Sequence, residues 1–245
     1  MSESEKTLVT IATYNEIDNI PILVDEIFKV VPDVDILVID DNSPDGTGRW
    51  CDDRRRSDQR IDCLHRDGKL GLGTAIIAGM RYGIARGYKH VLNMDADFSH
   101  HPRYLPTLID GMDPADGESV DVMIGSRYVP KGGVEGWPIR RQLMSRCVNL
   151  YARTMLGLKS KDCSGAYRCY RTELLAKLDF DEIRSRGYSF QEEVLWHLRR
   201  VSARFGETPI IFTDRQRGSS KIDSKEAIEA LRIIFALGIQ NITSR

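Results

Sequence analysis

The 245-residue sequence lacks several features that would assign it to a common class of protein. No apolar run approaches the roughly 20 residues that cross a bilayer, and the N-terminal segment "MSESEKTLVTIATYNE" has no signal-peptide core. We therefore expect a soluble chain with no transmembrane domain. Basic residues are not in excess, because the formal net charge is −1, and this excludes a bulk-basic nucleic-acid binder.

Cysteines are few and show no pattern. The five are Cys51, Cys63, Cys147, Cys163 and Cys169. An odd number without any CxxC spacing indicates neither a disulfide framework nor a zinc site, and it fits a reducing cytosol.

Complete glycine motifs for nucleotide binding are also absent. The stretch "KLGLGTA" at residues 69–75 contains GxG but lacks the third glycine of the dinucleotide fingerprint, and no GxxxxGK loop occurs. We interpret these glycines as positions where the chain passes close to a neighbouring strand or ligand.

Apolar, β-branched runs alternate with segments of helical periodicity in the first half of the chain. The predicted strands are residues 7–12, 35–40, 61–65, 90–94 and 120–125. The predicted helices between them are residues 17–31, 46–56, 73–87, where Gly87 is the expected C-cap, and 102–112. This alternation predicts an α/β fold with a doubly wound, mostly parallel sheet and helices on both faces. Such sheets bind ligands at the carboxyl ends of their strands.

The second half has a different pattern but no linker-like composition. It predicts a long helix at 139–156, a helix within 190–206 and a strand "TPIIFT" at 208–213. We therefore expect a single domain over residues 1–245, made of a nucleotide-type half, an acceptor-type half and a C-terminal helix, at about 7–127, 128–222 and 223–245 respectively.

Three acidic or aromatic groups follow predicted strands. Asp95 and Asp97 come after strand 90–94, and two such carboxylates can share a hard divalent cation that neutralises phosphate. The alternative is a solvated turn in which Ser99 caps a helix that has Pro102 in its first turn.

The other two groups suit a nucleoside. Asp40 and Asp41 can accept hydrogen bonds from a base or ribose, or they belong to a turn that starts the next helix. Tyr14 can stack on a base and Glu16 can accept from one, or both are polar loop residues.

Cationic side chains recur in the second half wherever a strand or helix meets a loop. Arg127 and Arg215 each follow an apolar strand, where a guanidinium can hold an anionic oxygen in a bidentate grip. Together they indicate an anion site, and the set comprises Arg127, Arg140, Arg141, Arg168 and Arg215, with Ser220 and Lys221 beside the last.

Taken in order, these segments resemble a known family. The motifs are "TYNE", "DDNSPDGT", "GLGTA", "MDADFSHHP", "GSRY", "GWPIRRQLMS", "SGAYRCYR", "FQEE" and "RQRGSSK". They resemble the dolichol-phosphate mannosyltransferases, which are family-two glycosyltransferases of the GT-A fold. The resemblance runs from about residue 8 to residue 222.

The resemblance implies transfer of mannose from GDP-mannose to a polyprenyl (dolichyl-type) phosphate, with inversion and with Mg²⁺ or Mn²⁺. It implies that the nucleoside is held by Ala12, Tyr14, Glu16, Asp40 and Asp41. It implies that Asp95, Ala96 and Asp97 hold the metal and pyrophosphate. It implies that acceptor phosphate or donor pyrophosphate is bound by Arg127, Arg140, Ser145, Arg215, Ser220 and Lys221. Among these, Asp97, Arg127 and Arg215 are the predicted catalytic residues.

Two positions depart from the family pattern. Ala12 stands where the family often has proline, and this could loosen the nucleoside loop without removing a ligand. Ser99 stands where some members place a metal-binding glutamine, so water is expected to fill that coordination position.

A phosphate acceptor is already anionic near neutral pH, because its second pKa is about 6, and it needs no general base. Glu192 and Glu193 can nevertheless be a base, or acidic residues that begin a helix. We favour a positioning role for Glu193.

The C-terminal segment 224–245 is too short in apolar residues to span a membrane. It can lie at a bilayer surface, bind a partner, or pack as an ordinary core helix. The resemblance places the protein in the cytoplasm, peripherally on the cytoplasmic face of a membrane.

Two other functions stay open. One is a UDP-glucose-dependent enzyme that glycosylates polyprenyl phosphate or a glycan. The other is a non-catalytic subunit that binds a nucleotide sugar, although the intact DxD sequence argues against it.

Overall fold

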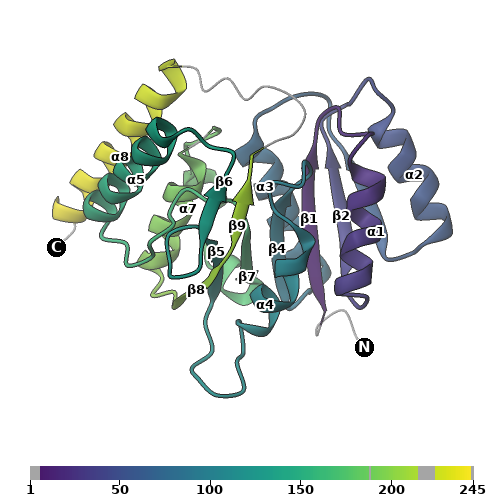
Figure 1. Ribbon diagram of the computed structural model, residues 1–245, viewed down its shortest axis with the longest axis horizontal. Helices are drawn as coiled ribbons and strands as arrows, with labels where there is room; N and C mark the ends of the chain where they lie inside the picture. The colour runs from purple at the N-terminus through teal and green to yellow at the C-terminus, as the bar shows by residue number, and fades with distance from the viewer. Residues whose placement is uncertain (1–5, 188, 215–223, 244–245) are drawn as a thin grey trace.

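The computed structural model describes residues 6–187, 189–214 and 224–243. Its centre is a sheet of seven strands in the order β3-β2-β1-β4-β7-β5-β8 (Figure 1). These strands are β1 (Thr7–Thr13), β2 (Asp35–Asp40), β3 (Ile61–His65), β4 (His90–Asp95), β5 (Val122–Ser126), β7 (Arg168–Arg171) and β8 (Phe205–Pro209). Strands β1 to β4 are parallel, β7 is antiparallel to β4 and β5, and β8 is parallel to β5.

The predicted mostly parallel sheet is therefore confirmed, and five of its strands begin and end within two residues of their predicted limits. β2 is buried at all six of its residues, because helices cover both faces of the sheet. Strand β7 was not predicted, since its four residues are too short to show a periodic pattern.

Helices lie on both faces of the sheet. One core contains apolar side chains of α1 (Ile20–Val30), α2 (Thr47–Ser57) and α4 (Leu105–Asp110). The other contains those of α3 (Leu72–Arg86), α5 (Ile139–Leu156), α6 (Thr172–Leu175), α7 (Phe190–Arg200) and α8 (Ser224–Thr243). Two short 3₁₀ turns, η2 (Pro102–Tyr104) and η3 (Phe180–Glu182), complete the helical segments.

Helix α1 illustrates why these segments are helical. Its buried residues are Ile20, Leu23, Val24 and Ile27, a spacing that places them on one face, towards the sheet. Helix α3 ends at Gly87, which adopts the left-handed conformation with φ 72°, so the predicted C-cap is confirmed.

The predicted strand "TPIIFT" is wrong as a single element. The chain ends β8 at Pro209 and then begins β9 (Ile211–Thr213), which pairs in parallel with β6 (Gly133–Glu135) to form a separate two-stranded sheet. The buried Ile210 between them donates its N–H to the carbonyl of Ser126, and this contact lies where the chain passes from one sheet to the other.

Helix α8 packs against the protein through one side only. Ile234 and Leu237 are buried in the second core, whereas Phe235 is half exposed. Among the described residues, no helix combines the length and the apolar character needed to cross a membrane.

Candidate active site

The carboxyl ends of β1, β2 and β4 bring the predicted donor residues to one edge of the sheet. In the parallel register, Ala12 of β1 is opposite Asp95 of β4, and Thr13 is opposite Asp40 of β2. Residues that lie far apart in the sequence thus become neighbours, because parallel strands end at the same edge.

Asp95 and Asp97 form the acidic part of this edge. Both are partly exposed, and one oxygen of Asp97 accepts the N–H of Ser99 at 3.0 Å. The two side chains supply carboxylate oxygens only, and a hard divalent cation prefers such donors, so the residues present fit Mg²⁺ or Mn²⁺. Ala96 between them is buried.

The alternative that Ser99 caps a helix is wrong. His101 is the capping residue, because its side chain accepts the N–H of Arg103 at the start of η2. Phe98 adopts a positive φ of 63°, which turns the chain sharply after Asp97.

His100 supports the acidic pair from inside the protein, a role that no sequence motif indicated. Its Nδ1 accepts the backbone N–H of Asp95 at 3.0 Å, and its ring stacks on Tyr167 with the centroids 4.8 Å apart. Burial lowers the pKa of His100, so the ring is neutral and can accept this hydrogen bond. We infer that His100 positions the backbone that carries Asp95.

Asp40 organises the loop that follows β2. Its carboxylate accepts the hydroxyls of Thr13 and Ser43 and also the N–H of Ser43. The first residues of α2 press against it, since a Cβ on Gly48 would lie 2.8 Å from an Asp40 oxygen. Asp40 therefore has a firm position at the edge, although several of its hydrogen bonds go to the protein itself.

Asp41 is paired with a residue that the sequence did not single out. The Nε of Arg66 lies 2.9 Å from an Asp41 oxygen, and both side chains are about nine-tenths buried. Burial raises the pKa of Asp41, and Arg66 opposes that rise. Close by, the ammonium of Lys69 lies 4.8 Å from the ring centroid of Tyr14, whose side chain is 40% exposed.

Glu16 stands at the start of α1. One of its oxygens accepts from the side chain of Asn19 at 2.7 Å, and its backbone N–H donates to the hydroxyl of Thr47. These contacts join the loop after β1 to the loop after β2.

Arg127 lies across the edge, after β5, and it is held by a partner from a distant loop. Asp162 accepts its backbone N–H, its Nε and its Nη2 at 2.9, 2.7 and 2.7 Å, and Ser164 accepts from Nη2 as well. Burial acts to raise the pKa of Asp162, but Arg127 outweighs it and holds that pKa below its usual value. The bidentate grip predicted for an anion is thus directed at Asp162.

The other predicted acceptor residues are placed differently. Ser145 accepts the hydroxyl of Tyr128 at 2.7 Å, or donates to it, and Arg140 is exposed. The next residue, Arg141, lies 4.1 Å from the Trp137 ring centroid and pairs with Asp214 at 2.9 Å. The three predicted residues Arg215, Ser220 and Lys221 lie outside the residues that the structure describes.

Glu193 is buried, and its two oxygens accept the N–H groups of Arg184 and Ser185 at 3.0 and 2.7 Å. This geometry suits the positioning role, which stays a prediction. Glu192 is also buried, and burial raises its pKa to about 7 against the opposing effect of Arg168.

A row of carboxylates at one end of a parallel sheet, faced by guanidinium groups, can hold a metal-bound diphosphate beside a second anion. Together with the sheet topology, this arrangement is that of a GT-A glycosyltransferase. The model of glycosyl transferase family 2 matches residues 8–179, and the chain belongs to that family.

Curated relatives extend over almost the whole chain. A polyprenol monophosphomannose synthase of Mycolicibacterium smegmatis is 41% identical over 99% of this chain and 90% of its own length. An undecaprenyl-phosphate mannosyltransferase of Micrococcus luteus is 43% identical over 96% of this chain and 94% of its own. The resemblance drawn from the motifs is confirmed.

Among solved structures, glucosyl-3-phosphoglycerate synthase of Mycobacterium tuberculosis, in complex with Mn²⁺, UDP and its product, matches with a TM-score of 0.64. The match covers 97% of this chain and 79% of that one at 20% identity, so it shows a shared fold.

Proposed function

We propose that this protein transfers mannose from GDP-mannose to a polyprenyl phosphate, with inversion at the sugar carbon. The observation that carries the proposal is that two relatives at 41% and 43% identity, each spanning nearly the whole chain, are polyprenyl-phosphate mannosyltransferases by name. The division into a donor half and an acceptor half, at about residues 7–127 and 128–222, is part of the same proposal.

On the donor side, the loops after β1 and β2 bind the nucleoside. Tyr14 offers an exposed ring for stacking on the base, while Asp41 and Glu16 accept hydrogen bonds from base or ribose. Asp95 and Asp97 hold Mg²⁺ or Mn²⁺, which when bound supplies Lewis-acid stabilisation of the leaving diphosphate. Ala12 and Ala96 shape this edge through the backbone, and Asp40 holds the loop after β2 through its carboxylate.

On the acceptor side, cationic groups hold the phosphate that attacks the sugar. Arg140 and Ser145 are the described members to which we assign contact with the phosphate, because the guanidinium of Arg127 is held by Asp162. Arg215, Ser220 and Lys221 belong to the group by the resemblance. Because a phosphate monoester is anionic near pH 7, it attacks without a protein base. Glu193 fits this mechanism, since both of its oxygens are already used to hold the loop at residues 184–185.

The acceptor is a membrane lipid, so we propose that the protein acts peripherally on the cytoplasmic face of a membrane. Two features support this. All five cysteines are free, as expected in a reducing compartment. Apolar side chains are exposed on α5 and α8, including Leu150 and Phe235.

The test is a transfer assay with the full chain. Radiolabelled GDP-mannose or UDP-glucose is incubated with polyprenyl phosphate, with Mg²⁺, with Mn²⁺ or with EDTA, and the lipid fraction is counted. We expect label in lipid from GDP-mannose only, and none in EDTA. The transfer releases GDP, and the anomeric configuration of the mannose in the lipid product, read by NMR, should be opposite to that of the donor.

Each other outcome assigns a different function. Label from UDP-glucose alone would replace the donor, and label in a soluble glycan would replace the acceptor. If nucleotide sugar binds in calorimetry but no product forms with any acceptor, the chain is a non-catalytic binding subunit and the proposal fails.

A further inference from the structure

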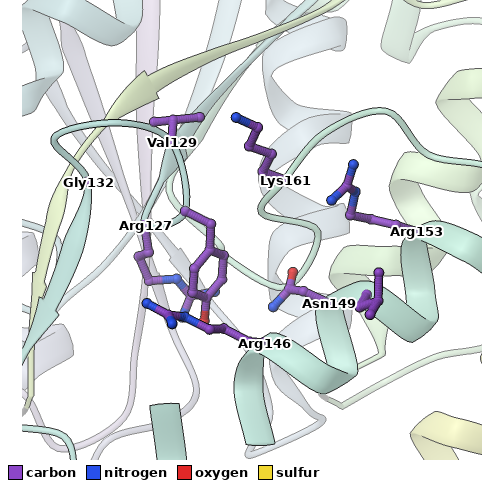
Figure 2. A pocket seen from close by; sticks show the side chains of 9 residues that line it. Arg127, Val129, Gly132, Arg146, Asn149, Arg153 and Lys161 are labelled. Carbon is purple, nitrogen blue, oxygen red and sulfur yellow. The ribbon is translucent and has the colours of Figure 1, made fainter. Parts of the chain in front are cut away.

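A cavity of about 340 Å³ lies beside α5 and borders the acceptor side of the site, where Arg127 and Tyr128 form part of its wall (Figure 2). Arg146, Asn149, Leu150 and Arg153 line it from α5, and their spacing of three and four residues places them on one face of the helix. Lys161 lines it from the loop that follows α5. Figure 2 shows Arg146, Arg153 and Lys161 at the cavity, with Arg127 beside Arg146.

The cavity carries positive charge that nearby acids do not neutralise. Across residues 6–187, 189–214 and 224–243, no acidic side chain forms an ion pair with Arg146, Arg153 or Lys161, and the buried Nε of Arg153 has no hydrogen-bond partner. Glu207 comes close, but its oxygens accept the backbone N–H groups of Lys161 and Asp162 at 2.8 and 3.1 Å. The chain as a whole has a net charge of −1, so this excess is local.

Arg127 also borders the cavity, and it differs from the other three cations. Its charge is balanced by Asp162 at 2.7 Å in a buried pair. The three cations without a described partner can therefore bind an anion without breaking any contact of the fold. Guanidinium and ammonium groups that line one cavity can donate hydrogen bonds to the oxygens of a phosphate group.

Next to the cavity lies an apolar surface made by two neighbouring helices, which we call the α5–α8 face. Ile139, Leu143 and Leu150 belong to α5, and Leu150 is also a wall of the cavity. On α8, four apolar residues recur at three- and four-residue spacings and form one stripe. The stripe consists of Ile228, Leu231, Phe235 and Ile239, and the seven side chains of the face are between 42% and 76% exposed.

Hydrogen bonds join the two helices, so their exposed apolar residues form one continuous surface. The hydroxyl of Tyr151 donates to the carbonyl of Leu231 at 3.4 Å, and Asn241 donates to the carbonyl of Met155 at 3.1 Å. Figure 1 shows α5 and α8 side by side, away from the β1–β4 edge. An apolar surface of this extent bordered by free cations has the composition that binds the interface of an anionic bilayer.

We propose that the basic cavity of Arg146, Arg153 and Lys161 binds the phosphate of an anionic phospholipid headgroup, while the α5–α8 face enters the bilayer interface. The inference rests on the proposed function in that the acceptor is a membrane lipid. It goes beyond that function, because it assigns a second lipid, which is not a substrate, to three cations that have no role in the proposed transfer. Docking then depends on the charge of the membrane as well as on apolar burial.

The test is flotation of the full chain with vesicles, in the absence of donor and acceptor. We compare vesicles of phosphatidylcholine alone with vesicles that also contain phosphatidylglycerol. The wild type should bind the anionic vesicles more tightly. Combined replacement Arg146→Gln, Arg153→Gln and Lys161→Gln should weaken that binding roughly tenfold to hundredfold, since each cation near an anionic surface contributes to attraction.

The matched control removes the same charge elsewhere. Arg49→Gln, Lys177→Gln and Arg200→Gln together change exposed cations that lie on neither α5 nor α8. This control should bind within about twofold of the wild type, because charges beyond a Debye length of about 10 Å are largely screened. A second variant, Leu150→Ser with Phe235→Ser, should weaken binding to both kinds of vesicle. Thermal unfolding checks that all variants fold.

Three results would overturn the headgroup site. The first is unchanged vesicle binding by the cavity variant, and the second is an equal loss in the control. The third comes from transfer to a short-chain, water-soluble isoprenoid phosphate. There the cavity variant should keep its rate within twofold, and a large fall would show that the cavity holds the acceptor phosphate instead. If the wild type makes no product in this assay, the proposed function fails while the vesicle result still stands.

Discussion

The two sides of the candidate site are built in different ways. On the β1–β4 side, several contacts are with near neighbours in the sequence: Asp40 binds Ser43, three residues away, and Asp97 binds Ser99, two residues away. Distant contacts, such as that of Asp41 with Arg66, add to them. On the β5–β9 side, the partners are distant: Arg127 and Asp162 are 35 residues apart, and Arg141 and Asp214 are 73 apart. The first side leaves carboxylates partly exposed for a cation, whereas the second neutralises its guanidinium groups within the fold.

An arginine at the end of a strand is therefore not always available to bind an anion. Arg127 follows a buried strand, as an anion-binding residue would, yet its guanidinium group is bound to the carboxylate of Asp162. The free cations Arg146 and Arg153 lie on α5 and Lys161 lies in the loop that follows it, at positions that no strand pattern marks.

The largest expected effect comes from breaking the distant pair. Asp162→Asn puts an amide N–H₂ among the donors of Arg127 and Gly165, in a site that is fully buried. We expect a loss of about 3 to 5 kcal/mol in the free energy of unfolding, measured in urea. Asp214→Asn, whose side chain is 34% exposed, should lose about 1 kcal/mol or less. Equal losses would remove the distinction between the two pairs.

The next effect concerns the β1–β4 side and is measured as a change in kcat. Asp97→Ala should lower kcat about 10²- to 10³-fold, because the charge of the leaving diphosphate would no longer be balanced in the transition state. Stability should change little, since Asp97 is partly exposed. Asp110→Ala, at the exposed end of α4, is the control and should keep the wild-type rate. A normal rate for Asp97→Ala would remove this residue from the metal site.

The third effect is a pH dependence of the free energy of unfolding, caused by Glu192. Burial raises the pKa of Glu192 from 4.5 to about 7, so the folded protein favours the protonated carboxyl. The stability that it contributes is present below pH 4.5 and is lost as the pH rises towards 7. Glu192→Gln cannot ionise, and it should gain about 2 to 3 kcal/mol relative to the wild type between pH 4.5 and pH 8. Parallel stability curves for the two proteins, from urea unfolding across this range, would contradict the burial argument.

The smallest effect concerns the ion pair between Arg66 and Asp41, beside the loops proposed to bind the nucleoside. Arg66→Gln removes the charge that opposes the raised pKa of Asp41, so this pKa should rise further. Nucleotide binding should weaken, and the loss should grow as the pH falls, because a protonated Asp41 is a weaker acceptor than the carboxylate. Calorimetry with GDP and Mg²⁺ at several pH values measures this, with Arg56→Gln, whose side chain is 78% exposed, as the control. The same loss at every pH would mean that Arg66 acts on nucleotide directly and not through Asp41.

Much of the fold was predictable because its signals are local. Strand β2 is a continuous apolar run, α5 begins and ends as its periodicity predicts, and Gly87 closes α3. Strand β7 and the break at Ile210 were missed, since a short antiparallel strand and a change of sheet leave no period in the sequence.

The site was predictable where residues follow strands. Asp40, Asp95 and Ala12 share one edge, as the strand register requires. Arg66 and Asp162 were not predicted, because their roles depend on contacts with residues brought close only by folding. His100 was missed because its burial against Tyr167 leaves no sign in the local sequence. Asp162 did lie within the quoted stretch "DCSGAYR", but no local rule pairs it with Arg127.

Apolar periodicity and motif spacing are properties of neighbouring residues. The order of the strands and helices, the family, and the kinds of side chain at the strand ends therefore follow from the sequence alone. Only the tertiary structure decided which charges are balanced and which are free. Ion pairing depends on distances across many residues and on burial, so Arg127 is held by Asp162 while Arg146, Arg153 and Lys161 surround a cavity.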